Sequence, residues 1–435
     1  EFAGSGALAL QAQTPRPNVL IVMTDQQAWN ALSAAGNPWV TTPAMDAIAR
    51  NGLRIEQSYC TYPVCSPSRS SVFTGRMPHE TGVRDNNNPI AAGIPTMGEV
   101  FRDAGYSTVY AGKWHLPKGF DGMTGFTKIA GGSALGRDMD AGVASACAKW
   151  LRTAPQQPFL MVASFMNPHD VCDWIRQHPG SRRHADAAKF PPAPANLGAD
   201  PMEPEAIQHH RTQGIDLMSK AVGIAREWRA DDFRHYLHDY YRMVEDVDRE
   251  IGKVLGALSA AGLRDRTLIA FMSDHGEGMG GHRWVQKASF YEESVRVPLI
   301  FAGPGVTALG TDRTSLASLA DVMPTLCGMA GVSTPSGITG RSLAPLLRGE
   351  PLESRPVFSE LRYGGPEREG RMVRTERYKY IVFNSGARPE QLFDLTTDPG
   401  ETVNLAGSEP GAIREHRELL RRWIADTRDD FAMPA

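Results

Sequence analysis

Five short apolar runs recur along the first three quarters of the chain, each bounded by polar or turn residues. They are Asn18–Met23, Thr108–Ala111, Phe159–Phe165, Leu268–Met272 and Pro298–Ala302. Runs of this length are typical of β-strands, and a strand that is covered on both faces is apolar along its whole length. The pattern therefore predicts strands buried within a mostly parallel sheet.

Helical periodicity occupies the segments between these runs. From about Asp231 to Ala261 apolar residues recur every three or four positions, and Gly262 follows, which predicts one long helix that ends at a glycine. Shorter segments with the same periodicity are Met97–Ala104 and Gly142–Arg152. Strands that alternate with helices indicate an α/β fold in which helices sandwich one large, mostly parallel sheet.

The pattern changes after about Leu347. Short segments separated by turns predict antiparallel strands, and a final helix is expected at about Gly411–Asp426. The predicted strands are Pro356–Leu361, Arg371–Arg374, Tyr378–Phe383 and Gln391–Leu395. We therefore expect a large domain at residues 14–347, followed at residues 348–435 by a smaller C-terminal α+β domain that carries an antiparallel sheet.

Residues 1–13 are expected to be the remnant of a tag and of a signal peptide. The short apolar piece Gly6–Gln13 ends in small residues, as sequences do near a secretory cleavage site. This expectation places the protein in the periplasm of a bacterial cell or outside the cell. No apolar run approaches the ~20 residues of a membrane-spanning helix, so no membrane partner is expected.

The charge of the chain is nearly balanced. Its 435 residues include 46 lysines and arginines and 49 aspartates and glutamates, which gives a formal net charge of −3. Proteins that bind nucleic acids usually carry a basic excess, so this balance argues against a nucleic-acid partner but not against a small anionic substrate. Five cysteines are too few for a disulfide framework, and the odd number leaves at least one thiol unpaired within the chain.

Four of the predicted strands run directly into side chains that bind metals or anions. These strand ends carry Asp25-Gln26, Lys113-Trp114-His115, His169-Asp170 and Asp274-His275. Ligands of parallel sheets bind beyond the carboxyl ends of the strands. We therefore expect these side chains to meet at one edge of the sheet and to form the functional site.

A further candidate lies in the segment Cys65-Ser66-Pro67-Ser68-Arg69. Pro67 is well placed to open a helix, because its fixed φ and missing N–H cost nothing in a first turn. Cys65 would then lie at a helix amino terminus, where unpaired N–H groups favour negative charge, and Arg69 would lie one turn later. The spacing alone indicates an activated cysteine or an anion-binding turn, with a structural turn around a buried thiol as an equal alternative.

This segment, with Thr74-Gly75-Arg76 after it, resembles the first signature of the formylglycine-dependent (type I) sulfatases of the alkaline-phosphatase-like superfamily. Gly105–His115 resembles the second signature, and Leu392–Leu405 is similar to the C-terminal domain of the family. Three further features fall in the order of the family, namely Asp25, Ser273–Gly276 and Lys287. The resemblance covers nearly the whole chain, from Pro17 to about Leu405, and makes the large domain the catalytic one.

The resemblance implies covalent catalysis at Cys65. A formylglycine-generating enzyme would convert the cysteine to formylglycine before folding, and the hydrated aldehyde would carry two hydroxyls on one carbon. One hydroxyl would attack sulfur and expel the alcohol or amine of the substrate. The other would then lose its proton, so that the sulfate departs as the carbonyl re-forms.

The resemblance also implies a divalent metal, held by Asp25, Gln26, Asp274 and His275. Carboxylate and amide oxygens suit a hard cation such as Ca²⁺. Two positions depart from many relatives, which have a second aspartate at the position of Gln26 and an asparagine at that of His275. The lower charge and the nitrogen ligand leave Mg²⁺ and Mn²⁺ as alternatives.

The remaining candidates are assigned to the anion and to proton transfer. Arg69, Lys113 and Lys287 are expected to surround the sulfate oxygens and to stabilise the charge of the transition state. We expect His115 to hold the formylglycine hydrate and to assist its deprotonation. His169 is expected to protonate the leaving group, with orientation of the substrate as its alternative role.

Four residues are the candidates for substrate contacts. They are Asp170, Asp85, Asn86 and His282. Asp170 follows the proposed general acid, and Asp85 and Asn86 belong to an amide-rich stretch that could bind sugar hydroxyls or form a simple polar turn. His282 lies near the Asp274 strand end. The Pro-rich and Ala-rich stretch from Gly180 to Ala206 reads as a surface excursion that contributes to specificity.

These inferences favour a sulfatase that hydrolyses a sulfate ester or sulfamate, with a sulfated glycan preferred over a small aryl ester. One alternative is a phosphonate or phosphate diester hydrolase of the same superfamily. Another is a catalytically silent member that binds sulfated glycans. The complete set of Cys65, Arg69, Lys113, His115 and Asp274 argues against the silent alternative.

Overall fold

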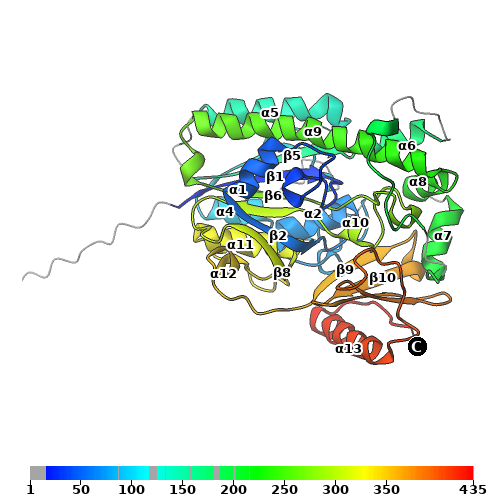
Figure 1. The fold of residues 1–435 in the computed structure, drawn as a ribbon. Coiled ribbons are helices and arrows are strands. Elements are labelled where there is room, and N and C mark those ends of the chain that lie inside the picture. The colour runs from blue at the N-terminus through cyan, green and yellow to red at the C-terminus, as the bar shows by residue number, and fades with distance from the viewer. Residues whose placement is uncertain are drawn as a thin grey trace, which may run out of the picture.

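The computed structural model describes residues 16–434 except 87, 117–124, 133, 154, 156–157, 180–186, 199–201 and 215. Two sheets organise these residues (Figure 1). The larger has the strand order β4-β3-β5-β1-β6-β7-β2-β8, and the smaller has the order β12-β11-β10-β9. The strands of the larger sheet are β1 (Asn18–Asp25), β2 (Gly52–Tyr59), β3 (Ser107–Gly112), β4 (Thr127–Ala130), β5 (Phe159–Pro168), β6 (Thr267–Ser273), β7 (Leu299–Ala302) and β8 (Gly310–Ser318).

Each of the five apolar runs forms a strand of the larger sheet, and the sheet is mostly parallel, as predicted. Strand β1 pairs in parallel with β5 and with β6, and β3 pairs in parallel with β5 and β4. Strand β7 is antiparallel to β6 and β2, while β2 and β8 are parallel. The sequence pattern missed β2, β4 and β8. The outer strands β4 and β8 expose much of their length and therefore need no apolar run.

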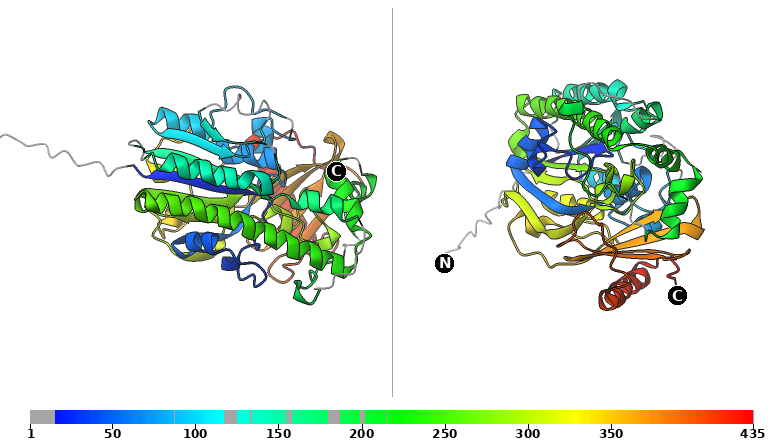
Figure 2. Two further views of the ribbon diagram at one scale, coloured as in Figure 1. Left: turned by 90° about the horizontal axis from the view of Figure 1, so that it is seen from above. Right: turned by 45° about the vertical axis from the view of Figure 1, so that its right-hand side comes forward.

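Helices cover both faces of this sheet (Figure 2). Leu20 and Val22 of β1 face a core that includes residues of α1 (Pro43–Arg50), α5 (Gly136–Leu151) and α9 (Ala230–Ala260). Val19 and Ile21 face the opposite core, with α2, α4 and α11. The long helix predicted from Asp231 is α9, and the glycine after it has positive φ.

The other helices are short apart from the last. They are α2 (Cys65–Thr74), α3 (Pro78–Thr81), α4 (Met97–Asp103), α6 (Val171–Gln177), α7 (Glu205–Gln213), α8 (Leu217–Ala225), α10 (Glu292–Val295), α11 (Val322–Ala330), α12 (Ala344–Leu347) and α13 (Pro410–Thr427). Single-turn 3-10 helices occupy Ser33–Ala35, Ala187–Lys189, Arg264–Arg266, Gly281–Arg283, Leu319–Asp321 and Pro366–Arg368.

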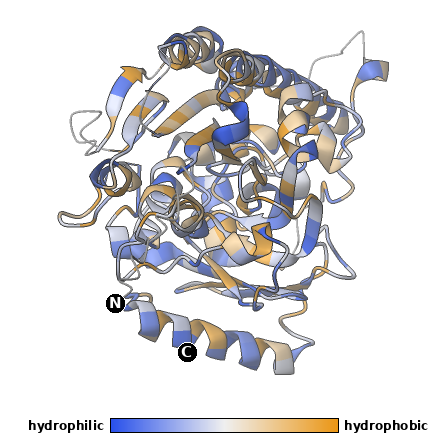
Figure 3. Ribbon diagram, turned by 90° about the vertical axis from the view of Figure 1, so that its left-hand side faces the viewer, coloured by the Kyte–Doolittle hydropathy of each residue, from blue (hydrophilic) through white to orange (hydrophobic). Residues whose placement is uncertain are grey.

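The smaller sheet is antiparallel, as predicted, and is buried on both faces. Its strands are β9 (Val357–Arg362), β10 (Glu369–Arg374), β11 (Tyr378–Phe383) and β12 (Glu390–Asp394). Because side chains alternate along a strand, Met372 and Ile381 face the core of the larger sheet, whereas Val373 and Tyr380 face α13. Apolar and polar bands alternate along α13 in Figure 3, which is the pattern of a helix with one buried face.

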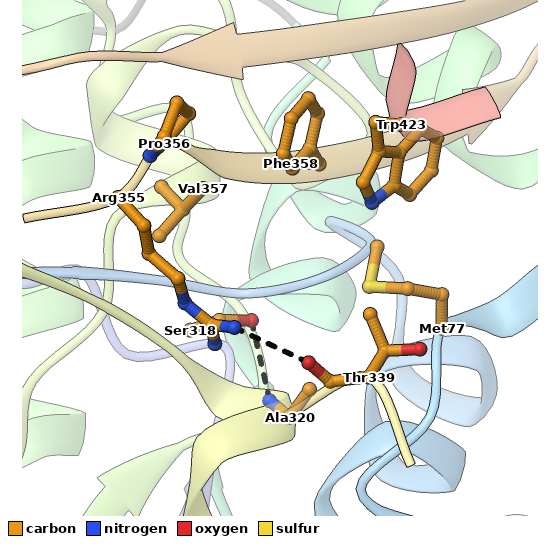
Figure 4. A pocket seen from close by; sticks show the side chains of 9 residues that line it. All are labelled: Met77, Ser318, Ala320, Thr339, Arg355, Pro356, Val357, Phe358 and Trp423. Atoms are coloured by element: carbon orange, nitrogen blue, oxygen red, sulfur yellow. Dashed lines mark hydrogen bonds between the residues drawn. The ribbon is translucent and has the colours of Figure 1, made fainter. Parts of the chain in front are cut away.

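The C-terminal sheet packs on α13 and also contacts a helix of the large domain. Phe358 of β9 stacks on Trp423 of α13, with ring centroids 4.7 Å apart, beside a small pocket of about 160 Å³ (Figure 4). The imidazole of His79 reaches from α3 to Glu360 of β9 at 2.7 Å. The C-terminal sheet therefore packs directly on the helices that surround the strand ends of the larger sheet.

Two expectations of the sequence analysis concern regions outside these sheets. The expected tag and signal remnant, residues 1–13, lies outside the described residues. Within the described part of the chain, no helix is both long and apolar enough to cross a membrane.

All five cysteines are buried and unpaired, so the fold depends on no disulfide.

Candidate active site at the carboxyl edge of the larger sheet

The four predicted strand ends meet at one place, around the thiol of Cys65. Asp25 is the last residue of β1, and Asp274 and His275 follow β6 directly. The side chains of Lys113 and Lys287 reach the same thiol from the end of β3 and from the loop between β6 and β7. The site is therefore assembled at the carboxyl edge of the parallel strands, as the topology requires.

Cys65 is the first residue of α2, which confirms the helix start predicted from Pro67. The preceding Val64 is extended, and all residues of α2 are buried. The backbone N–H of Ser66 donates to Oδ1 of Asn86 at 3.0 Å, so a side chain caps one of the free N–H groups of the first turn. Cys65 is thereby held at the amino end of a buried helix.

Cationic and imidazole groups surround the sulfur of Cys65. Its Sγ lies 3.1 Å from Nζ of Lys287, 3.2 Å from Nε2 of His275 and 3.5 Å from Nζ of Lys113. Burial raises the pKa of the Cys65 thiol, but the charges of Lys113, Lys287 and His275 outweigh burial and hold the pKa well below its usual range. The site therefore stabilises negative charge at position 65.

Four donor groups converge in a manner that fits a divalent cation. One donor atom from each of Asp25, Cys65, Asp274 and His275 lies within 4.8 Å of the others, and all four residues are buried. Nδ1 of His275 lies 2.9 Å from the carbonyl oxygen of Gly276. Because a carbonyl only accepts, Nδ1 carries a proton, so Nε2 is the ring nitrogen that would bind a metal after losing its own proton.

The charges of this cluster also fit a bound cation. Burial and the neighbouring Asp25 carboxylate raise the pKa of Asp274 to about 6, although Arg69 acts against them. Two carboxylates buried together repel each other, and a divalent cation between them would remove that cost. The residues present therefore suit a hard cation with carboxylate and imidazole ligands.

The side chain of Gln26 makes hydrogen bonds within the protein, and its expected role as a metal ligand stays a prediction. Its amide nitrogen donates to Glu277 at 2.5 Å, and its amide oxygen accepts from the thiol of Cys172 at 3.4 Å. The backbone N–H of Gln26 instead donates to Oδ1 of Asp274 at 3.2 Å. Gln26 therefore supports a candidate ligand through its main chain.

Arg69 contacts both of the aspartates that are candidate metal ligands. Its Nε donates to Asp274 at 2.7 Å and its Nη2 to Asp25 at 3.0 Å. Its Nη1 donates to the carbonyl of Lys113 and to the hydroxyl of Ser164. The guanidinium is fully buried, and its forked geometry suits the two carboxylates that it holds in place. Its expected contact with the sulfate oxygens stays a prediction.

Two of the four substrate-contact candidates make close contacts within the protein. The carboxylate of Asp170 accepts the backbone N–H groups of Gly136 at 2.7 Å and Arg137 at 3.0 Å, so it anchors the start of α5. His282 is fully buried and stacks on Tyr291 with ring centroids 3.8 Å apart. Their expected contacts with substrate stay a prediction.

The other two candidates stay near the site. Asp85 is exposed, and Asn86 is half-buried while its side-chain oxygen caps α2. Asn86 therefore has a positioning contact beside Cys65, which the sequence pattern did not indicate.

The two histidines assigned to proton transfer both reach Cys65. Each has a side-chain hydrogen bond with the thiol, and His115 is exposed whereas His169 is partly buried. Burial and the charges of Lys287 and Lys113 lower the pKa of His169 to about 4. Without a bound anion, His169 is therefore neutral at ordinary pH.

Glu277 is a buried residue of this region that the sequence analysis missed. It lies two positions after His275, and its carboxylate accepts hydrogen bonds from Gln26, from the Tyr236 hydroxyl and from the backbone of Gln286. The sequence does show an acidic residue just after the Asp274-His275 pair. Only the fold reveals that this residue is buried.

Comparisons with known proteins agree with this geometry. The sequence model of the sulfatase family matches residues 17–332, and the family described as N-sulphoglucosamine sulphohydrolase, C-terminal, matches residues 280–428. The chain is 33% identical to a Delta 4,5-hexuronate-2-O-sulfatase of Bacteroides thetaiotaomicron over 449 aligned residues, which cover 97% of this chain and 92% of that protein.

Solved structures extend the similarity to the whole fold. A 2-O GAG sulfatase matches with a TM-score of 0.88 and 31% identity, and the match covers 96% of this chain and 93% of that chain. The phosphonate monoester hydrolase of Agrobacterium radiobacter matches with a TM-score of 0.78 and 25% identity, covering 95% and 96%.

Proposed function

Because the chain belongs to the sulfatase family and is therefore a sulfuric ester hydrolase, we propose that it removes a sulfate group from a carbohydrate at Cys65. The observation that carries this proposal is the convergence on one sulfur atom of a helix amino terminus, two lysines and two buried aspartates. Such a site binds a tetrahedral anion and stabilises charge that develops next to position 65.

The nucleophile of the proposed reaction is the residue at position 65 after conversion to formylglycine. The hydrated aldehyde would supply one hydroxyl to form a bond with sulfur and a second to release the sulfate. Cys65 is fully buried in the folded chain, so a formylglycine-generating enzyme would have to act before folding is complete. This order makes the maturation enzyme a partner of the unfolded chain.

We propose Asp25, Asp274, His275 and position 65 as the ligands of a divalent cation, with Ca²⁺ preferred over Mg²⁺ and Mn²⁺. Once bound, the cation would supply positive charge that lowers the pKa of a hydroxyl at position 65 and attracts a sulfate oxygen. Arg69 holds both aspartates in place through hydrogen bonds of 2.7 and 3.0 Å.

The two lysines would bind the sulfate oxygens, and the two histidines would move protons. Lys287 makes no ion pair with a carboxylate among the described residues, whereas Lys113 lies 2.5 Å from a carboxylate oxygen of Asp25. A bound sulfate would offset the lysine charges that depress the pKa of His169, so the imidazole would gain the proton that a leaving alcohol needs. His115 would hold the hydrate.

The substrate class follows from the relatives. One relative is named for a hexuronate 2-O-sulfate, and one solved structure is named as a 2-O GAG sulfatase. We therefore propose an O-sulfated sugar, in particular a sulfated uronate from a glycosaminoglycan, as the first substrate to test. We further propose that the protein meets this substrate in the periplasm or outside the cell.

A release assay tests the proposal. Sulfate is measured by ion chromatography after incubation with 2-O-sulfated unsaturated uronate disaccharides, 6-O-sulfated glucosamine and an aryl sulfate, with a phenyl phosphonate monoester in parallel. We expect release from a sulfated sugar at a kcat/KM above that for the phosphonate. Faster hydrolysis of the phosphonate would instead support the diester-hydrolase alternative, to which the match with a phosphonate monoester hydrolase also points.

A further inference from the structure

Glu277 is a buried carboxylate that has no step in the proposed chemistry. None of its surface is exposed. Its Oε2 accepts the side-chain amide of Gln26 at 2.5 Å. Its Oε1 accepts the hydroxyl of Tyr236, on α9, and the backbone N–H of Gln286. One side chain thus joins the end of β1, helix α9 and the loop that leads to Lys287.

Two partners of Glu277 hold an uncommon backbone conformation. Gln26 has a φ of 68° and Gln286 a φ of 65°, in the left-handed region that few residues other than glycine adopt. A residue in this region is strained and persists only where its surroundings enforce the conformation. Glu277 holds the side chain of Gln26 and the backbone N–H of Gln286, so its carboxylate opposes the relaxation of both residues.

Each strained residue lies next to a group of the active site. Lys287 follows Gln286, and its ammonium lies 3.1 Å from Sγ of Cys65. Gln26 follows Asp25, and its backbone N–H donates to Asp274 at 3.2 Å. Relaxation of the turn at Gln286 would withdraw Lys287 from Cys65. Relaxation of the turn at Gln26 would free the carboxylate of Asp274, which is a candidate metal ligand.

We infer that Glu277 is a positioning residue, which holds Lys287 and the Asp25–Asp274 pair in their active arrangement through two left-handed turns. The inference deepens the proposed function and rests on it. Groups one shell behind a metal or catalytic residue typically contribute about 10–100-fold to activity or metal affinity. Glu277→Ala should therefore lower kcat by about 10–100-fold while KM changes by less than about threefold.

A matched control separates positioning from general stability. Asp248 is also a buried carboxylate that holds backbone N–H groups, those of Ala44 and Met45 at 3.0 and 2.8 Å, and it lies on the same helix as Tyr236. Asp248→Ala leaves buried N–H groups without an acceptor, as Glu277→Ala does, so both variants should lose thermal stability. Only Glu277→Ala should lose kcat. An equal loss of kcat in both variants would overturn the inference.

An exchange of the two side chains provides a test that does not depend on a truncation that could prevent folding. Gln26→Glu alone places two carboxylates against each other, and we expect it to be the worst single variant. Glu277→Gln keeps an oxygen for Gln286 and Tyr236 and should be milder than Glu277→Ala. The double exchange Gln26→Glu with Glu277→Gln restores one acid facing one amide, and it should recover at least about tenfold in kcat over Gln26→Glu.

The link to Lys287 is tested by combining variants. If Glu277 acts through the lysine, Glu277→Ala should cost much less in a Lys287→Ala background than in the wild type, whereas independent effects would multiply. Multiplicative effects would remove Lys287 from the inference. If the wild type released sulfate from no sulfated substrate, the proposed function would fail. Crystal structures of wild type and Glu277→Ala would then still decide whether Gln286 relaxes and Lys287 moves.

Discussion

Removal of the Lys287 ammonium is the perturbation for which the structure gives the clearest expectation. Lys287 is buried, and its Nζ lies 3.1 Å from Sγ of Cys65. Lys113 lies slightly farther away, at 3.5 Å, and also contacts Asp25 at 2.5 Å. The charge of Lys287 is therefore the one more fully available to an anion at position 65.

The magnitude follows from this distance. Two unit charges about 3 Å apart at an effective dielectric of about 20 attract each other by ~5 kcal/mol, which is an upper value because solvent and neighbours compensate in the variant. Removal of one preorganised donor from an enzyme anion site typically costs about 2.7–4 kcal/mol, or 10²–10³-fold in kcat. We expect Lys287→Ala to lower kcat by that factor on every sulfate substrate, and Lys113→Ala to lower it by less.

The assay is the initial rate of sulfate release at saturating substrate, with fully matured protein and added Ca²⁺. Lys253→Ala is the control, because Lys253 is an exposed lysine of α9 whose ammonium contacts only Glu250 among the residues described. It should keep the wild-type rate. A loss below about fivefold for Lys287→Ala would refute the assignment of this lysine to the developing charge, since it lies far below the 10²–10³-fold range.

Three further predictions concern the metal, the leaving group and the joint between the sheets. Chelation should abolish activity, and added Ca²⁺ should restore it. Asp274→Ala should weaken the metal affinity, measured by calorimetric titration, more than Gln26→Ala does; equal affinities of the two variants would contradict the ligand set. His169→Ala should steepen a plot of log rate against leaving-group pKa, and parallel lines would mean that His169 only orients substrate. Burial lowers the pKa of His79, but the hydrogen bond and the charge of Glu360 outweigh burial, so the pKa is raised. The other ring nitrogen of His79 faces the carbonyl of Thr427. The stabilisation is present below the unfolded pKa of about 6.5 and is lost as pH rises through the folded pKa, so His79→Gln should reduce the free energy of unfolding more at about pH 5.5 than at about pH 9; no pH dependence would contradict it.

The strands and the location of the site could be predicted because each has its own pattern in the sequence. Buried parallel strands are continuous apolar runs, and their ends deliver polar side chains to one edge, so β1, β3, β5 and β6 were found together with Asp25, Lys113 and Asp274. Cys65 was placed at a helix start by Pro67 alone. These are local patterns that tertiary packing preserves.

The direction in which a side chain points could not be predicted from such patterns. Arg69 is one turn from Cys65 as expected, yet its fork is taken by two carboxylates that come from distant parts of the sequence. Asp170 follows His169, but its carboxylate turns to the start of α5. Hydrogen bonds between residues far apart along the chain decide these orientations, and Glu277 was missed for the same reason.

The C-terminal boundary at residue 348 stays a prediction, although the small sheet and α13 form where the pattern changed. Both faces of that sheet are buried, one against the larger sheet's core and one against α13.

His210 and Arg211, in α7, are also buried. The ring of His210 stacks on Tyr363, with centroids 4.3 Å apart. The polar sequence of His210 and Arg211 does not indicate their burial, because their aromatic and acidic partners lie in other segments of the chain.

The role of position 65 as the nucleophile is decided by measuring activity as a function of the modification of Cys65. The chain is produced with and without a formylglycine-generating enzyme, the peptide that contains position 65 is analysed by mass spectrometry, and sulfate release is measured on the same samples. The account predicts that activity rises in proportion to the fraction of thiol converted to aldehyde, and that Cys65→Ala is inactive while it unfolds at nearly the wild-type temperature. Full activity in a sample that contains only the unmodified thiol would contradict it.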